Sequence, residues 1–395
     1  MTSKNPCFRA IFCSVRIKEL ETLDAFDEAL ADGLHKLRGY HLQSLDLTGR
    51  ARELSGINVA GGVFLGCRFA PGEGPGTEID VRRRGGLVFP TVPDVPFDPY
   101  RARLYSPDEL YAGLEDGYSA TPDAIAYAWS LQPRAVDRTL AAALHDHAID
   151  DALEEFVEGR ELVGVLGGHA LARDEPGYRE AAVLGRELAT QFTVATGGGP
   201  GAMEAANLGA WMAGHDESAL DEAIAVLAAA PHFADDLSAW ARAAFTVRER
   251  WAHPRRDPSA DQQPGPNGRD SLGIPTWFYG HEPPNPLASV IAKYFSNATR
   301  EDVLLKVCRR GLVFLPGAAG TVQEIFQAAC ANYYAQAPSV VPMVLVGVEH
   351  WTREVGVWEL LRSLGADRAF GARLDLVDST AEVLPLLAQR RGDLG

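Results

Sequence analysis

The chain has 395 residues, of which 46% are hydrophobic, and its 53 acidic and 37 basic side chains give a formal net charge of −16. The hydrophobic fraction is typical of globular proteins and excludes a chain that is disordered throughout. The acidic balance argues against a duplex-binding surface, which needs Lys and Arg to displace condensed counterions, so we expect no nucleic-acid partner. The length favours two domains, or one large domain with additions.

Cysteine usage and hydropathy bear on the compartment. The cysteines form no CxxC pair and no Cys/His cluster with zinc spacing, so we expect reduced thiols and no metal site. Charged residues such as Arg9, Arg16 and Lys18 interrupt the apolar core that a signal peptide needs. No apolar run approaches the ~20 residues that cross a bilayer. These features predict a cytoplasmic protein without a membrane partner.

The first part of the chain, residues 1–120, is predicted to be a mostly β and irregular domain of unknown role. Short apolar runs at 63–65 and 87–89 are separated by turns rich in Gly and Pro. Apolar residues then recur at helical spacing over 121–158, which predicts connecting helices. The run 145–147 (His-Asp-His) lies within them. Because positions i and i+2 of a helix point apart, we interpret this run as a solvated helix face rather than a metal site.

From residue 159 to 395 the pattern is strand, Gly-rich turn and helix, repeated. Such alternation predicts an α/β domain with a doubly wound, parallel, Rossmann-like sheet that binds ligands at the carboxyl ends of its strands. Residues 216–270 are predicted to be an insertion that is helical at first and mobile over 253–270, where almost no apolar residue occurs. The expected strands are 162–166, 192–195, 274–279, 312–315, 340–346 and 374–377.

Two Gly-rich loops each connect an expected strand to an expected helix. The first is Gly-Gly-Gly-Pro-Gly-Ala-Met-Glu over 197–204. Glycines there let the backbone approach an anion at the start of a helix, although a tight turn required for packing would look the same. The loop lacks the GK[ST] ending of a triphosphate-binding P-loop.

The second loop is Pro-Gly-Ala-Ala-Gly-Thr-Val-Gln-Glu over 316–324. Gly320 and Thr321 can donate hydrogen bonds to phosphate oxygens from the start of the next helix. Glu324 is expected in the first turn of that helix. Its carboxylate is either a cap of the helix or a group that stabilises positive charge in a transition state.

These loops carry a family resemblance. Residues 316–324 resemble the PGGxGTxxE signature of the LOG-type Rossmann family, misnamed "lysine decarboxylase". The segments 167–169 (Gly-Gly-His), 196–204 with Gly-His at 214–215, and 282–286 (Glu-Pro-Pro-Asn-Pro) look like a narrower branch, the bacterial pyrimidine/purine nucleotide 5′-monophosphate nucleosidases. The four motifs keep their order and cover roughly residues 160–350.

The resemblance implies hydrolysis of the N-glycosidic bond of a nucleoside 5′-monophosphate to free base and ribose 5-phosphate, without a cofactor and in a homo-oligomer. It assigns the catalytic roles to Glu324 and to Arg300, which stands in an REDVL rather than an RKxxM context. Ala318 replaces the second loop glycine, which requires a negative φ. The residues implied to bind substrate or phosphate are Gly198, Gly199, Gly201, Ala202, Met203, Gly317, Gly320, Thr321, His169, Glu282 and Asn285.

Other functions stay open beside this one. The same fold could bind a nucleotide or cofactor without turnover, and a cytokinin riboside 5′-monophosphate phosphoribohydrolase would share the chemistry with a different base. A pyridoxal phosphate decarboxylase would need a Schiff-base lysine. Within the expected sheet domain only Lys293 and Lys306 are available, and we expect both on one amphipathic helix rather than at a strand end.

Four further features call for an interpretation. His169 could contact phosphate or ribose or could be structural, and Glu282 and Asn285 could bind ribose or base or could be turn residues. Glu204, early in its helix, is interpreted as a partner of the helix dipole. The aromatic run 277–279 is expected to be a buried strand with one ring able to stack on a base.

Overall fold

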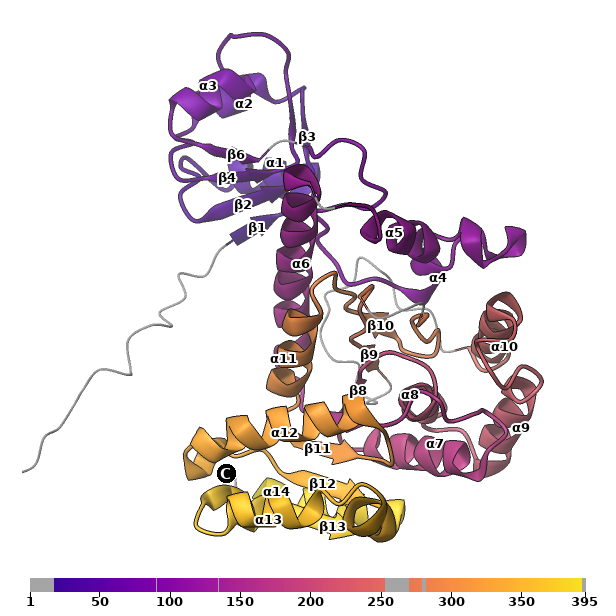
Figure 1. Ribbon diagram of the computed structural model, residues 1–395. Coiled ribbons are helices and arrows are strands. Elements are labelled where there is room, and N and C mark those ends of the chain that lie inside the picture. Colours follow the sequence, from indigo (N-terminus) through magenta and orange to yellow (C-terminus); the bar gives the residue numbers. More distant parts are fainter. Residues whose placement is uncertain (1–17, 90, 134, 253–269, 279–281, 393–395) are drawn as a thin grey trace, which may run out of the picture. The chain divides into compact units, whose positions relative to one another are not determined.

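The computed structural model describes residues 18–392 except 90, 134, 253–269 and 279–281 (Figure 1). Most of the expected mobile segment 253–270, and Tyr279 of the aromatic run, therefore lie outside the described residues. The chain divides into two compact units, which we describe separately. Unit 1 consists of Met1–Ala102 and Ala135–Ala148, and unit 2 of Arg103–Arg134 and Ile149–Gly395.

Unit 2 is built on a parallel sheet with the strand order β10-β9-β8-β7-β11-β12-β13 among the described residues. The chain starts in the middle of this sheet with β7, adds strands outward to β10, and returns to β11 on the other side of β7. This order confirms the expected doubly wound fold and places its switch point between β7 and β11, where such sheets bind ligands. The strands are β7 (Leu162–Leu166), β8 (Thr193–Thr196), β9 (Ser271–Gly273), β10 (Val290–Ile291), β11 (Gly311–Phe314), β12 (Met343–Val346) and β13 (Leu374–Val377).

Two expectations about unit 2 are wrong, one about a strand and one about a helix. Residues 274–278 do not form the predicted strand 274–279, because β9 stops at Gly273 and Pro275 has no N–H to donate to a neighbouring strand. Lys293 is not on a helix: it follows β10 and is buried, and α11 starts only at Asn297. Of the two lysines considered for a Schiff base, only Lys306 is helical.

The helices of unit 2 follow the expected alternation, and two of them, α9 and α10, form the described part of the insertion. The α-helices are α4 (Pro107–Leu110), α5 (Pro122–Ser130), α7 (Pro176–Leu188), α8 (Ala202–Trp211), α9 (Glu217–Leu227), α10 (Leu237–Arg250), α11 (Asn297–Val307), α12 (Ala319–Tyr334), α13 (Trp358–Gly365) and α14 (Val383–Gly392). Short 3₁₀ or π turns are η1 (Leu114–Asp116), η2 (Tyr118–Ala120), η3 (Ala337–Ser339), η4 (His350–Glu354), η5 (Ala369–Arg373) and η6 (Thr380–Glu382).

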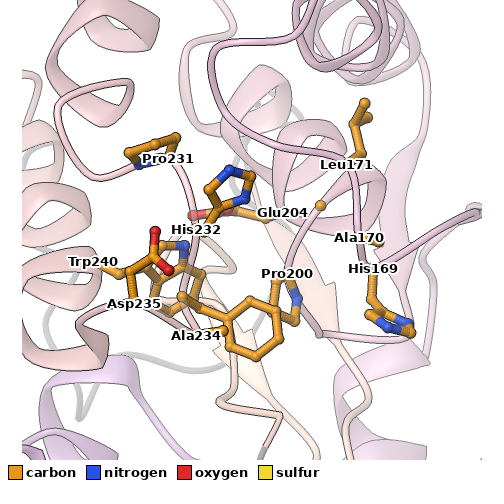
Figure 2. A pocket seen from close by; sticks show the side chains of 12 residues that line it. His169, Ala170, Leu171, Pro200, Glu204, Pro231, His232, Ala234, Asp235 and Trp240 are labelled. Atoms are coloured by element: carbon orange, nitrogen blue, oxygen red, sulfur yellow. The ribbon is translucent and has the colours of Figure 1, made fainter.

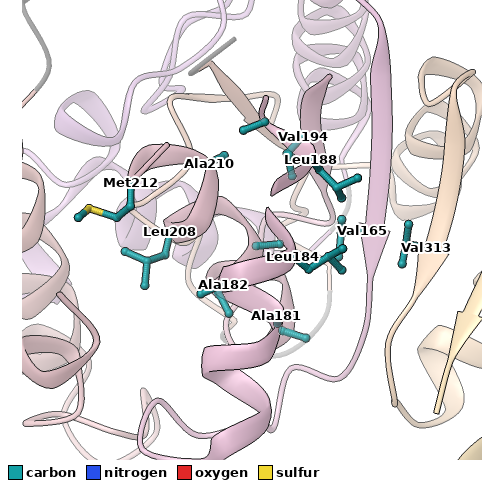
Figure 3. Packing of buried hydrophobic residues seen from close by; sticks show 14 of the residues in the cluster. Val165, Ala181, Ala182, Leu184, Leu188, Val194, Leu208, Ala210, Met212 and Val313 are labelled. Carbon is teal, nitrogen blue, oxygen red and sulfur yellow. The ribbon is translucent and has the colours of Figure 1, made fainter. Parts of the chain in front are cut away.

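The core beside the sheet depends on the close packing of α7 on α8 (Figure 3). Apolar side chains of both helices, such as Leu184 and Leu208, lie with strand residues such as Val165 in one buried cluster. Glycines let the two backbones touch: a Cβ on Gly209 would lie 1.9 Å from the Ala182 oxygen. This packing fixes the start of α8, and with it the first Gly-rich loop.

Unit 1 contains parallel strands that repeat at nearly constant spacing. Lys18 pairs with Tyr40, His41 with Val63 and Val63 with Leu87, which gives a period of 22 to 24 residues. No such repeat is evident in the sequence. The strands are β1 (Lys18–Leu20), β2 (Tyr40–Gln43), β4 (Val63–Leu65) and β6 (Leu87–Phe89), with β3 (Asp46–Leu47) paired to β5 (Arg68–Phe69).

Helices α1 (Leu23–Ala31), α2 (Ala51–Gly56) and α3 (Glu78–Arg83) connect these strands, and a cluster of buried residues including Phe26 and Phe64 forms the core of unit 1. The long helix α6 (Val136–Val157) starts in unit 1 and ends in unit 2. The prediction that the run 145–147 forms a solvated helix face is wrong, since the His145 side chain is fully buried next to Asp146.

Among the described residues, no helix is long and apolar enough to span a membrane.

We predict that Gly209→Ala destabilises the protein by about 3 kcal/mol, because the added methyl group would overlap the α7 backbone and force the two helices apart. An exposed helical glycine would show the opposite sign, since alanine is the better helix former. Thermal unfolding measures the effect. The control is Gly56→Ala, whose Cβ meets open space; equal unfolding temperatures for both variants would contradict the close-packing argument.

Candidate functional site

The candidate site lies at the carboxyl ends of the strands in unit 2, where three loops are tied together. The Gly168 N–H, after β7, donates to the Pro316 oxygen after β11 at 3.0 Å. The Gly168 oxygen accepts from the Ala202 N–H at the start of α8 at 3.1 Å. Gly201 has a φ of +71°, and a Cβ there would lie 2.5 Å from the Gly168 oxygen, so this turn requires glycine. The two Gly-rich loops are therefore neighbours, as expected for the switch point.

Arg300, in the first turn of α11, connects three parts of this site. Its Nε donates to the Ile274 oxygen at 2.6 Å, one Nη donates to the Gly197 oxygen at 3.1 Å, and the other lies 3.3 Å from Glu324 Oε1. The Arg300 and Glu324 side chains are only 11% and 13% exposed. The structure thus brings together the two side chains that the sequence predicts as catalytic.

Gly197 is a site residue that our sequence reasoning missed. A Cβ at this position would lie 2.2 Å from the Arg300 guanidinium, so only glycine lets Arg300 reach the loop carbonyl. The Met203 thioether packs beside it and beside Gly199. The run of three glycines at 197–199 indicates close approach of another group to the backbone, but we interpreted that group as an anion rather than as a side chain.

Glu324 lies in the second turn of α12, not the first, because the helix begins at Ala319. Burial raises the pKa of the Glu324 carboxyl above its ordinary value. Arg300 lowers that pKa, and the nearby Glu301 carboxylate raises it. Glu301 itself accepts hydrogen bonds from Asn297 and from Gln323, both at 2.8 Å. The net effect of these surroundings is a Glu324 pKa above its ordinary value, with burial as the main cause.

The second Gly-rich loop leads directly into α12, with Pro316 and residues 318–320 exposed and Thr321 buried. Ala318, the N-cap, has a φ of −105°, so the alanine in place of glycine is unstrained there. Gly320 is exposed, and a Cβ on it would meet nothing within 4 Å. The first N–H groups of a helix have no intrahelical acceptor, and the helix dipole favours an anion beside them. Gly317 lies against the Thr321 hydroxyl and contacts His350 Nε2 through both its N–H, at 3.3 Å, and its oxygen.

The first Gly-rich loop is buried and serves mainly as a scaffold. The Gly198 N–H donates to the Thr196 hydroxyl at 3.0 Å, and the Ala202 N–H is taken by Gly168. In this structure the Gly198 and Ala202 amides are therefore bound within the protein, and phosphate binding by these residues stays a prediction. The carbonyls of Gly198 and Gly199 accept from Asn285 at 2.8 and 3.2 Å, so the loop is held from both sides.

Asn285 is fully buried and its side chain bonds to the protein. Its Nδ2 donates to Gly199 and Asn207, and its Oδ1 accepts from Leu287 and Ala288. With every polar atom engaged, Asn285 supports the loop and has none left for ribose or base. The turn interpretation of this residue describes its position best.

His169 and Glu282 lie together at the mouth of the site, 3.6 Å apart and partly exposed. His169 also lines a pocket of about 280 Å³ beside Pro200 and Gly201 (Figure 2). The segment between α9 and α10, including His232 and Asp235, forms another part of its wall. The described lining residues include neither Arg300 nor Glu324, so this pocket adjoins the ion pair without containing it.

Glu204, at the base of this pocket, forms a buried ion pair with Arg173. Arg173 Nη2 and Nε donate to its two carboxylate oxygens at 2.5 and 3.2 Å, and the guanidinium lies 4.4 Å from the centre of the Trp240 ring. Glu204 is therefore bound to a side chain rather than only to the helix dipole. Arg173 was missed because nothing in its local sequence marks it.

Comparison with known proteins gives a similarity over part of the chain. No family model matches the chain, and no curated protein does. Among solved structures it is similar to a molybdenum cofactor binding protein from Rippkaea orientalis, with 15% identity and a TM-score of 0.34 over 59% of this chain and 98% of that one. It is similar to the Moco carrier protein from Chlamydomonas reinhardtii, with 16% identity, a TM-score of 0.34 and coverage of 60% and 99%.

A third similar structure is TM1055, with 19% identity, a TM-score of 0.33 and coverage of 58% and 99%. At these TM-scores the likeness carries no conclusion on activity or ligand, and the fold assignment rests on the strand order and register of unit 2. Unit 2 is a doubly wound α/β unit with a buried Arg–Glu pair at its switch-point edge.

Proposed function

We propose that this protein hydrolyses the N-glycosidic bond of nucleoside 5′-monophosphates and releases free base and ribose 5-phosphate. The observation that carries the proposal is the Arg300–Glu324 pair, which lies beside an exposed helix N-terminus at the carboxyl edge of the sheet. The four motifs that resemble the LOG-type family, and within it the nucleosidase branch, support the same reading.

The phosphate group would bind at the start of α12. The amides of Gly320 and Thr321 belong to the first turn, and anions bind at such helix ends through free N–H groups and the helix dipole. The exposure of Gly320 leaves room for a ligand over the backbone. The phosphate is remote from the bond that breaks, so its binding energy can orient the sugar.

Glu324 is three residues beyond Thr321, about 4.5 Å further along the helix axis at 1.5 Å per residue. A sugar anchored by its 5′-phosphate could then present its anomeric carbon to this carboxylate. As the C–N bond breaks, the electron pair leaves with the base and positive charge develops on the ribose. The carboxylate would stabilise that charge and accept a proton from the water whose oxygen bonds to the anomeric carbon. Transfer of that proton to the ring nitrogen of the departing base would return Glu324 to its carboxylate form.

Incubation of the purified protein with nucleoside mono-, di- and triphosphates and free nucleosides tests the proposal. Release of base and ribose 5-phosphate from monophosphates only is the expected result. Binding of nucleotides without release would establish the alternative, a non-catalytic nucleotide- or cofactor-binding protein. Turnover restricted to cytokinin riboside 5′-monophosphates would assign the other branch.

We predict that Glu324→Gln lowers kcat by a factor of about 10²–10³, because the neutral amide cannot stabilise the developing charge. The matched control is Glu359→Gln on α13, where the glutamate is exposed and remote from the loops. Steady-state release of ribose 5-phosphate measures both. Full turnover by the Glu324 variant would remove this residue from the mechanism.

We predict that Gly320→Ala weakens binding of a nucleoside 5′-monophosphate by about tenfold or more, equivalent to about 1.4 kcal/mol. The methyl group meets open space in the protein and would occupy the volume over the amides. Because alanine favours helix, the unfolding temperature should stay the same or rise slightly. Calorimetric titration measures binding, with Gly49→Ala as the control in open space. Unchanged affinity would place the phosphate elsewhere.

We predict that Arg300→Gln moves the acidic limb of the pH–rate profile to higher pH. Turnover needs the Glu324 carboxylate and is lost as pH falls through its pKa, which Arg300 lowers. Without the guanidinium, that pKa rises and the loss begins at a higher pH. A pH profile of kcat measures the shift, and an unmoved limb would show that Arg300 acts on some other group.

A further inference from the structure

Unit 2 contains a second buried ion pair that the proposed reaction does not use. Lys293 Nζ donates to Asp123 Oδ1 at 2.5 Å, and the two side chains are 1% and 0% exposed. Asp123 lies in the first turn of α5, and its other oxygen, Oδ2, accepts from the Tyr118 hydroxyl. The pair thus joins the segment after β10 to the helices that precede the sheet in the chain.

The Asp123 carboxylate also accepts a hydrogen bond from an aromatic side chain, Trp277, in the segment that follows β9. Trp277 Nε1 donates to Asp123 Oδ1 at 2.9 Å, and Lys293 Nζ lies 4.9 Å from the centre of the Trp277 ring. The ring also stacks on Phe295, with centroids 4.5 Å apart and an angle of 29°. The Trp277 N–H donates to the Tyr294 oxygen at 2.9 Å. Trp277 is therefore fixed through its indole, its ring face and its backbone.

Trp277 is three residues from Ile274, whose oxygen accepts from Arg300 Nε at 2.6 Å. Between them, the Pro275 oxygen accepts from the Tyr294 N–H at 3.0 Å. The segment 274–277 is not a strand, so its path is determined by isolated backbone bonds, including the Ile274 N–H to Thr196, together with the side-chain anchors. Arg300 holds one end of the segment and the Asp123–Lys293 pair holds the other.

A buried pair of this kind is a poor way to stabilise a fold. Removing two charges from water costs about as much as their attraction returns, and apolar residues of similar volume often serve as well or better. Leaving one partner without the other is strongly unfavourable. Such a pair can instead fix one conformation, and the segment that it anchors here, 274–277, begins with the carbonyl that accepts from Arg300.

We infer that the Lys293–Asp123 pair is a positioning device for the Arg300–Glu324 site, which it orders through Trp277 and the Ile274 carbonyl. Its effect on turnover rests on the proposed function, whereas its effect on the order of segment 271–278 does not. Neither Lys293 nor Asp123 would touch the substrate.

The test compares Lys293→Met/Asp123→Leu, which removes both charges and the acceptor of Trp277, with Asp123→Asn, which keeps an acceptor oxygen. The double variant should retain cooperative thermal unfolding, exchange the amide hydrogens of 271–278 at least tenfold faster, and lose about tenfold or more in kcat with a smaller change in KM. Asp123→Asn should speed exchange of the same segment at least as much, because it leaves the Lys293 charge buried without its partner. The control is Arg390→Met/Asp375→Leu, which removes an ion pair from α14 and β13.

Wild-type kcat and wild-type exchange in a folded double variant would overturn the inference, because the pair would then be dispensable to the site. If the double variant does not fold, Trp277→Phe decides, because it keeps the charge pair and removes only the indole N–H that donates to Asp123: faster exchange confined to 271–278 supports positioning, and unchanged exchange overturns it. If the wild-type protein turns over no nucleotide, the proposed function fails, while hydrogen exchange still decides the role of the pair.

Discussion

The candidate site depends on one guanidinium group. Arg300 donates to two main-chain carbonyls, Ile274 and Gly197, and faces the Glu324 carboxylate at 3.3 Å. These partners come from the ends of β9 and β8 and from α12, so a single planar group with donors in a fixed fork sets their spacing. A lysine could not replace it, since an ammonium group lacks this geometry. The glycine at 197 is a consequence of the same contact.

The two Gly-rich loops look alike in sequence but differ in what their backbones can offer. In the first, the amides of Gly198 and Ala202 and the carbonyls of Gly198 and Gly199 are bound within the protein. In the second, the start of α12 is exposed, with open space at Gly320. Glycines allow close approach of any group, and here the first loop is approached by Arg300 and Asn285. The second leaves exposed backbone at the start of α12, whereas the first contributes Pro200 and Gly201 to the wall of the pocket.

Local pattern in the sequence predicted five of the seven described strands of the large sheet and little of the geometry of the site. The expected strands 162–166 and 374–377 match β7 and β13 to the residue: the first is a run without polar side chains, and the second is apolar except for Asp375. β10 has two residues, too few for any periodicity to mark. Pairings such as Lys293 with Asp123, 170 residues apart, leave no local trace. The motif residues Arg300 and Glu324 were predicted through family resemblance, whereas the geometry that joins them depends on contacts that no motif describes.

The ion pair also bears on how an acidic chain could bind a phosphorylated substrate. With a net charge of −16, an uncompensated carboxylate one turn from a bound phosphate would repel it in a partly buried setting. Arg300 offsets the charge of Glu324, so the phosphate in the proposed complex would meet a nearly neutral pair and the positive end of α12. When positive charge then develops on the ribose, the carboxylate is already in place and needs no reorganisation. The guanidinium would thus favour binding of the substrate as well as stabilisation of the transition state. This role needs only that Arg300 stay next to Glu324, which is why its remaining donors bond to fixed carbonyls rather than to the ligand.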